Sequence, residues 1–87
     1  MTDAKVEVYL TQTCPFCMRA KKLLDKKGVA YEEIDVSDPA DREIMKERAD
    51  GRHTVPQVFI NDQGIGGCDE LFELEFDGDL DKMLGAD

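Results

Sequence analysis

The chain has 87 residues, with 20 acidic side chains against 11 lysines and arginines, and its formal net charge is −9. This acidity argues against a nucleic-acid partner, because phosphate binding needs a basic surface. The length suits one compact core, so we expect a single domain over residues 1–87. No apolar run is as long as a membrane span, and the first residues lack the apolar stretch of a signal peptide. We expect a cytoplasmic protein without a membrane partner, and we expect it to be monomeric.

Hydrophobic periodicity predicts strands and helices that alternate in the first half of the chain. Val6, Val8 and Leu10 alternate with polar or aromatic residues, as in a strand. In chain order, the expected elements are a strand over 6–10, a helix from Pro15 to Gly28, a strand over 31–36, a helix from Pro39 to about Ala49, a strand over 56–60, a turn over 61–64, a very short strand around Ile65, a helix through 71–76 and a last turn or two through 80–84. The order βαβαββα predicts an α/β fold with a four-stranded mixed sheet flanked by helices.

The second helix of this scheme has a clear start. Asp38 can cap the helix with its carboxylate, and Pro39 suits the first helical position. We expect Ala40, Ile44 and Met45 to be its buried residues.

Cys14-Pro15-Phe16-Cys17 stands where the first strand passes into the first helix. A thiolate at a helix N-terminus faces unpaired N–H groups and the positive end of the helix dipole, which favour the anion. Cys17 lies one turn deeper, from where it can resolve a mixed disulfide. We therefore expect Cys14 to be the nucleophile and Cys17 the resolving thiol. A CxxC beside a βαβ pattern in a cytosolic chain indicates a thioredoxin-like redox site and hence a thioredoxin fold.

Two other interpretations of the cysteines exist. A CxxC can be half of a zinc site, and Cys68 with His53 would complete a Cys3His set, although these two lack the paired spacing of structural sites. The two thiols could also be structural and buried, which would leave Pro15 at the helix entry unexplained. The distribution of charge near the CxxC also has two interpretations. Residues 11–27 hold five bases and one acid, which form either a basic patch around the CxxC or a solvated helix face.

The sequence resembles the glutaredoxins over nearly its whole length. Residues 13–17 resemble the family's TCPYC, with phenylalanine in place of tyrosine. Residues 54–56 resemble its TVP, where the proline is cis, and residues 66–69 resemble the GGCDD stretch of the bacterial glutaredoxin 3 group. The resemblance implies a glutathione-dependent thiol–disulfide oxidoreductase that reduces protein disulfides and glutathionylated proteins, with glutathione as co-substrate and no metal.

The resemblance also implies where glutathione binds. In the family, the backbone of the valine before the cis-proline pairs with the cysteine moiety of glutathione, which corresponds to Val55 and Pro56. Gly67, Cys68 and Asp69 open the third helix, whose N–H groups would hold the γ-glutamyl carboxylate; a helix N-terminus suits an anion. Cys68 itself we interpret first as a small, partly buried residue, and as a regulatory thiol second.

Three features differ from the family pattern: two residues, and the segment 48–55, which is one residue longer than usual. Thr11 stands where the family commonly has a lysine for glutathione's glycyl carboxylate, and Arg52 is the expected substitute. Glu70 replaces a second aspartate.

Two rival functions follow: a redoxin reduced by thioredoxin reductase, which Thr11 favours slightly, and an iron–sulfur carrier, which Pro15 counts against because iron-binding relatives usually have a smaller residue there.

Overall fold

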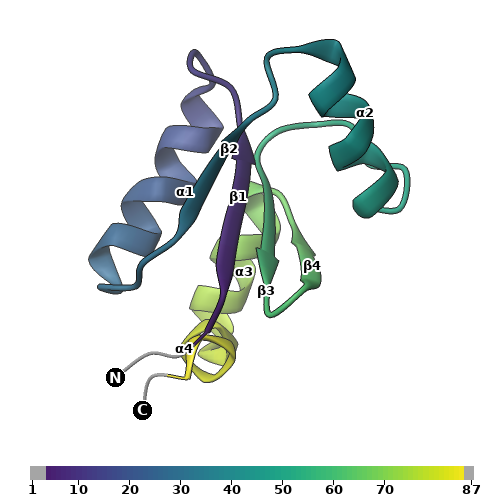
Figure 1. Ribbon diagram of the computed structural model, residues 1–87. Coiled ribbons are helices and arrows are strands. Elements are labelled where there is room, and N and C mark those ends of the chain that lie inside the picture. Colours follow the sequence, from purple (N-terminus) through teal and green to yellow (C-terminus); the bar gives the residue numbers. More distant parts are fainter. Residues whose placement is uncertain (1–3, 86–87) are drawn as a thin grey trace.

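The computed structural model describes residues 4–85 and shows a four-stranded sheet with the strand order β2-β1-β3-β4 (Figure 1). The strands are β1 (Val6–Leu10), β2 (Glu32–Asp35), β3 (Gln57–Ile60) and β4 (Gln63–Gly66), and the helices are α1 (Pro15–Lys26), α2 (Pro39–Arg48), α3 (Cys68–Asp77) and α4 (Asp79–Leu84). β1 pairs with β2 in parallel and with β3 antiparallel, and β3 pairs with β4 antiparallel. The predicted mixed sheet and the predicted thioredoxin fold are confirmed.

Local signals in the sequence set the element boundaries. The Asp38 carboxylate accepts a hydrogen bond from the Ala40 N–H at 2.8 Å, and Pro39 is the first residue of α2, as predicted. The hairpin turn is tighter than expected: Asn61 and Asp62 both have positive φ, so β4 already begins at Gln63. A two-residue loop with two left-handed residues matches the twist of paired strands, and asparagine and aspartate tolerate that conformation.

The two faces of the sheet carry separate cores. One core lies against α1, α3 and α4, whereas α2 stands apart from these helices and covers the other face (Figure 1). The buried residues of the first core are Val6, Val8, Leu10, Cys17, Ala20, Leu23, Leu24, Val29, Val58, Ile60, Leu71, Leu80 and Leu84, and those of the second are Tyr9, Val36, Met45, Ala49 and Phe59. Alternate residues of β1 and β3 therefore supply both cores.

The predicted burial of α2 is partly wrong. Met45 is buried as expected, but Ala40 is exposed and Ile44 is 61% exposed. The reason is that α2 meets the sheet along a narrow line, near its C-terminal end, where Arg48 takes up much of the contact.

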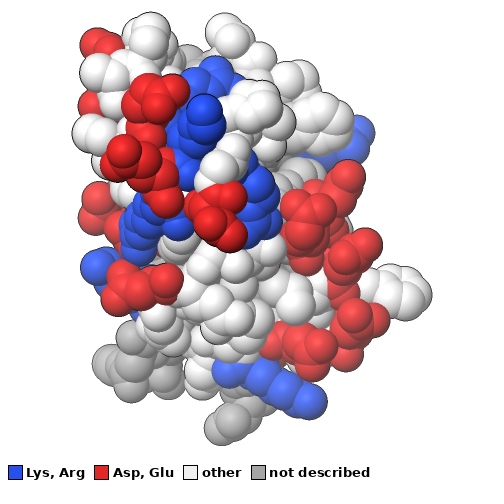
Figure 2. Space-filling view, turned by 90° about the vertical axis from the view of Figure 1, so that its right-hand side faces the viewer, with Lys and Arg blue, Asp and Glu red and all other residues white. Residues whose placement is uncertain are grey.

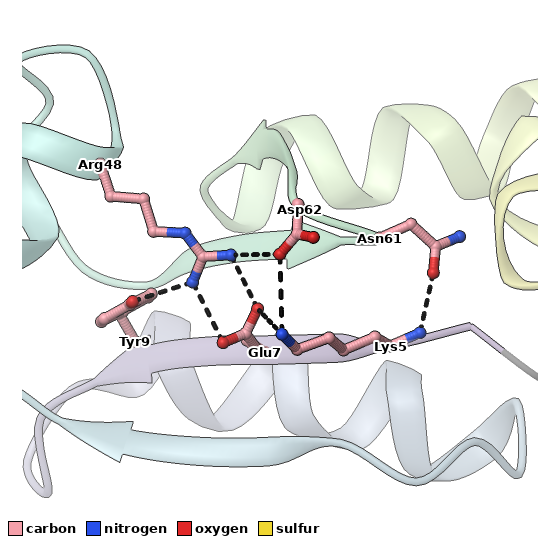
Figure 3. Close-up of polar contacts among 6 residues, drawn as sticks. All are labelled: Lys5, Glu7, Tyr9, Arg48, Asn61 and Asp62. Atoms are coloured by element: carbon pink, nitrogen blue, oxygen red, sulfur yellow. Dashed lines mark hydrogen bonds and ion pairs between the residues drawn. The ribbon is translucent and has the colours of Figure 1, made fainter.

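Arg48 fastens α2 to the sheet (Figure 3). Its guanidinium donates to both carboxylate oxygens of Glu7 at 2.8 and 3.1 Å, to the Tyr9 hydroxyl at 3.0 Å and to Asp62 at 3.0 Å. It also lies 4.1 Å from the centre of the Phe59 ring. The charged hydrogen bonds from Arg48 hold the pKa of the nearly buried Glu7 below its usual value, against the opposing effect of burial.

Among residues 4–85, no helix combines the length and the apolar character that a membrane crossing requires.

Candidate active site

Cys14 is the N-cap of α1. Its sulfur accepts a hydrogen bond from the Cys17 N–H at 3.3 Å, and Pro15 takes the first helical position. An N–H donor at the positive end of a helix stabilises negative charge on sulfur. The Cys14 side chain is partly exposed, and its thiol lies 3.7 Å from the Val55 carbonyl oxygen, to which it donates. The geometry at Cys14 is therefore that of an accessible thiol at a helix start, as the sequence predicts.

Cys17 has a different environment, although it is only three residues away. Its side chain is 2% exposed and belongs to the larger core. Burial, followed by the hydrogen bond and the charge of Cys14, raises the pKa of Cys17 to about 12, while a backbone hydrogen bond from Thr11 acts in the opposite direction. The two sulfurs are thus in unequal environments, because burial favours the protonated form of Cys17 whereas Cys14 is partly exposed at the helix start.

A cleft of about 180 Å³ lies beside Cys14, between the start of α1, the segment before β3 and the start of α3. Its lining residues are Phe16, Thr54, Val55, Pro56, Gly67, Cys68, Asp69 and Glu70. The Val55–Pro56 peptide bond is cis. Val55 lines the cleft and also contacts the nucleophile, because its carbonyl oxygen accepts the hydrogen bond from the Cys14 thiol.

Two glycines bring α3 close to the cis-proline. A Cβ added at Gly67 would lie 3.2 Å from the carbonyl oxygen of Pro56. Gly66 has a φ of +118°, and a Cβ there would lie 2.7 Å from the Glu70 carboxylate. That carboxylate accepts a hydrogen bond from the Gly67 N–H at 2.7 Å and so caps the helix start. Glycine suits both positions, because Gly67 lies close to the Pro56 backbone and Gly66 has the positive φ that L side chains rarely adopt.

The structure brings together five of the seven residues predicted to bind the co-substrate. Val55, Pro56, Gly67, Cys68 and Asp69 all line the cleft. Cys68 is buried, and burial followed by the charge of Asp69 raises the pKa of its thiol.

Thr11 and Arg52, the other two predicted contacts, are not in the lining of the cleft. Thr11 follows β1 and contacts Cys17 through its backbone. Arg52 donates from Nε to the Ala49 carbonyl oxygen at 3.3 Å, and its guanidinium lies beside Gly64 and Gly66 on β4. No lysine or arginine is therefore among the described residues that line this cleft.

Phe16, Thr54 and Glu70 line the cleft although they were not predicted as contacts. Each is adjacent in sequence to a predicted residue, or one residue removed. The sequence did carry a signal for all three, since Phe16 and Thr54 lie inside the motifs 13–17 and 54–56 and Glu70 directly follows the motif 66–69.

Within residues 4–85, no group of three or more histidine, cysteine or acidic side chains could hold a metal ion. His53, which the zinc interpretation requires, instead lines a hollow on the α2 side with Pro39, Arg42, Glu43 and Lys46.

Comparison with known proteins agrees with this geometry. The glutaredoxin family model matches residues 6–65. A probable glutaredoxin of Synechocystis is 60% identical over 85 residues, which cover 95% of this chain and 77% of that protein. Glutaredoxin 3 of Escherichia coli K12 is 51% identical over 82 residues, or 93% of this chain and 98% of that protein.

Solved structures show the same fold. The glutaredoxin of a buckwheat glutaredoxin–glutathione complex superposes with a TM-score of 0.85 at 34% identity, over 97% of this chain and 79% of that one. The glutaredoxin of Brucella melitensis gives 0.81 at 48% identity, over 92% and 87% of the two chains. With its CPFC motif at the start of α1 and its thioredoxin fold, the chain belongs to the glutaredoxin family of thiol–disulfide oxidoreductases.

Proposed function

We propose that this protein is a glutathione-dependent oxidoreductase that reduces glutathionylated proteins and protein disulfides. The observation that carries the proposal is the unequal pair of thiols beside a small cleft: Cys14 is partly exposed and is the N-cap of α1, whereas Cys17 is buried and its pKa is raised. The similarity to a glutaredoxin solved as a glutathione complex supports glutathione as the ligand of the cleft. We place the activity in the cytoplasm, where free thiols persist.

In this proposal, glutathione lies along Val55 with its γ-glutamyl carboxylate at the N-terminus of α3. The N–H groups of Cys68 and Asp69 open that helix, and a helix N-terminus binds anions. The acidic side chains of Asp69 and Glu70 line the same end of the cleft, where they suit the γ-glutamyl ammonium. For the glycyl carboxylate of glutathione, main-chain groups are the binding partners unless the Arg52 side chain turns toward it.

The monothiol branch uses Cys14 alone. The Cys14 thiolate attacks the glutathione sulfur of a protein–glutathione mixed disulfide, a new S–S bond forms, and the protein thiolate leaves and takes up a proton. A free glutathione thiolate then attacks glutathionylated Cys14, which regenerates the Cys14 thiolate and yields glutathione disulfide.

The dithiol branch needs Cys17. Cys14 attacks a protein disulfide and forms a mixed disulfide with the substrate, which removes the charge and the hydrogen-bond acceptor that help to raise the pKa of Cys17. Cys17 then loses its proton and attacks the Cys14 sulfur, the substrate leaves as a dithiol, and Cys14–Cys17 becomes a disulfide. Two glutathione molecules reduce that disulfide.

A coupled assay tests the proposal against its main rival. With a glutathionylated peptide as substrate, we expect NADPH oxidation in the presence of glutathione and glutathione reductase. With thioredoxin reductase in their place, we expect little turnover. Turnover that depends on thioredoxin reductase alone would instead identify a glutaredoxin-like redoxin.

A further inference from the structure

A second and larger hollow adjoins the cleft and runs between α1 and α3. This groove has a volume of about 930 Å³. Its lining residues are Arg19 from α1 and Cys68, Asp69, Phe72, Glu73, Phe76 and Asp77 from α3. Cys68 and Asp69 also line the cleft, so a molecule in the groove can extend to the reacting thiol.

The groove exposes two aromatic rings that the fold does not use. Phe76 is 91% exposed and Phe72 is 42% exposed, contrary to their place in an apolar helix pattern, because α3 packs on the core through Leu71. The two phenylalanines are four residues apart and so lie on one face of α3. Phe16, with the Arg19 guanidinium 5.9 Å from its ring centre, is also exposed and extends this aromatic strip to the cleft.

A row of acids runs beside the aromatic rings. Asp69, Glu73 and Asp77 follow one another at four-residue spacing, so they form a second stripe on α3 next to the phenylalanines. Figure 2 shows acidic side chains gathered along the right-hand edge of the face it presents, which is the edge formed by α3. Arg19 is the one base in the lining, so the groove combines apolar surface with net negative charge.

We propose that this groove binds a segment of the protein disulfide substrate in which a large apolar side chain is flanked by lysine or arginine. The apolar side chain would pack between Phe72 and Phe76, and the bases would pair with the acidic stripe. A second copy of this chain fits less well, because each copy carries a net charge of −9. The inference rests on the proposed function, since the segment is presented by a substrate whose cysteine reaches Cys14.

The helix fixes the distance between anchor and cysteine. From Cys68 to Phe76, α3 advances about 12 Å, which an extended chain covers in about four residues. Because the substrate cysteine reacts at Cys14 and not at Cys68, where the groove meets the cleft, we expect the anchor at least about four residues from the reacting cysteine.

Fluorescence anisotropy tests the groove without any thiol chemistry. One labelled peptide carries a lysine-phenylalanine-lysine triplet four residues from a serine in place of the reacting cysteine, and its partner carries glutamate-alanine-glutamate. Both are made with the triplet before and after the serine. We expect the basic peptide to bind the full chain at least about tenfold more tightly, an advantage that shrinks with salt.

Two matched variants locate the binding. Phe76→Ser with Glu73→Lys and Asp77→Lys should abolish the preference. Ile44→Ser with Glu43→Lys and Glu47→Lys makes the same changes of charge and apolar surface on α2 and should keep it. Phe76→Ser alone, at a side chain that is 91% exposed, should leave the stability nearly unchanged and reduce the preference several-fold.

Single-turnover reduction of disulfide peptides by the pre-reduced protein gives a second measurement that needs no glutathione. In this reaction we expect the same preference for the basic peptide. The variant with Phe76→Ser, Glu73→Lys and Asp77→Lys (the groove variant) should turn over the cysteine–glutathione mixed disulfide at a rate within twofold of wild type. Equal binding of the two peptides, or an unchanged preference in the groove variant, would overturn the inference. Loss of glutathione-coupled turnover alone would instead count against the proposed function and leave the groove standing.

Discussion

The two faces of the sheet are built on different physical principles. The face under α1, α3 and α4 has thirteen buried core residues, and Cys17 is one of them. The face under α2 has five, and there Arg48, Glu7 and Asp62 form an ion cluster at the rim. The apolar environment of Cys17 raises the pKa of its thiol, whereas no residue of α2 lines the cleft beside Cys14, and charges hold this helix on the sheet. Substitutions of the two thiols should therefore change activity, and substitutions in the ion cluster should change stability.

The largest expected effect comes from the thiol face. Cys14→Ser should abolish both deglutathionylation and protein disulfide reduction, because no other accessible thiol at a helix start exists within residues 4–85. Cys17→Ser should keep deglutathionylation, with an equal or higher rate since the internal side reaction is gone, and lose most dithiol reduction. Steady-state assays with a glutathionylated peptide and a protein disulfide measure both. If Cys17→Ser stopped deglutathionylation, the roles of the two thiols would be wrong.

The next effect concerns the α2 face and should leave the chemistry alone. Arg48→Met leaves the Glu7 carboxylate nearly buried without its main partner. Removal of one member of a buried ion pair costs about 3–5 kcal/mol, and because Arg48 is partly exposed we expect about 2 kcal/mol here. Urea unfolding of Arg48→Met and of the exposed control Lys46→Met gives the difference. Equal midpoints for the two variants would show that the cluster does not fasten α2.

The same cluster makes stability depend on pH in a defined window. The pKa of Glu7 is lowered in the folded protein, chiefly by hydrogen bonds from Arg48, so its contribution is fully present above the unfolded-state value of 4.5. As pH falls through the lowered folded-state value, Glu7 takes up a proton and that contribution is lost. We expect unfolding free energies measured at descending pH to fall more steeply for wild type than for Glu7→Gln. Parallel curves would mean that other carboxylates account for the acid sensitivity.

The smallest effect concerns the cleft. Because no lysine or arginine is among the described residues that line it, Thr11→Lys should supply a cation for the glycyl carboxylate of glutathione. At a partly exposed site such a contact contributes up to about 1 kcal/mol, so the apparent KM for a glutathionylated peptide should fall by about two- to fivefold. Gln12→Lys, one residue on, is the control. An unchanged KM would indicate that Arg52 or the main chain already meets that carboxylate.

Much of the fold could be read from local signals in the sequence. The capping Asp38, Pro39 and Pro15 at first helical positions, and the alternation in β1 each act within one turn or one strand, so they need no tertiary information. The CPFC motif likewise gives the order of its two thiols, because a three-residue step along a helix keeps the side chain on the same face and places it one turn deeper.

Tertiary structure decided the rest, because burial depends on what a helix faces and not on its own periodicity. Ile44 and Phe76 fit apolar helical patterns, yet both are exposed, since α2 meets the sheet along a line that Arg48 shares and α3 packs through Leu71. The position of Arg52 over β4 was equally beyond the sequence, because it depends on a contact with Ala49 and on the space that two glycines leave open.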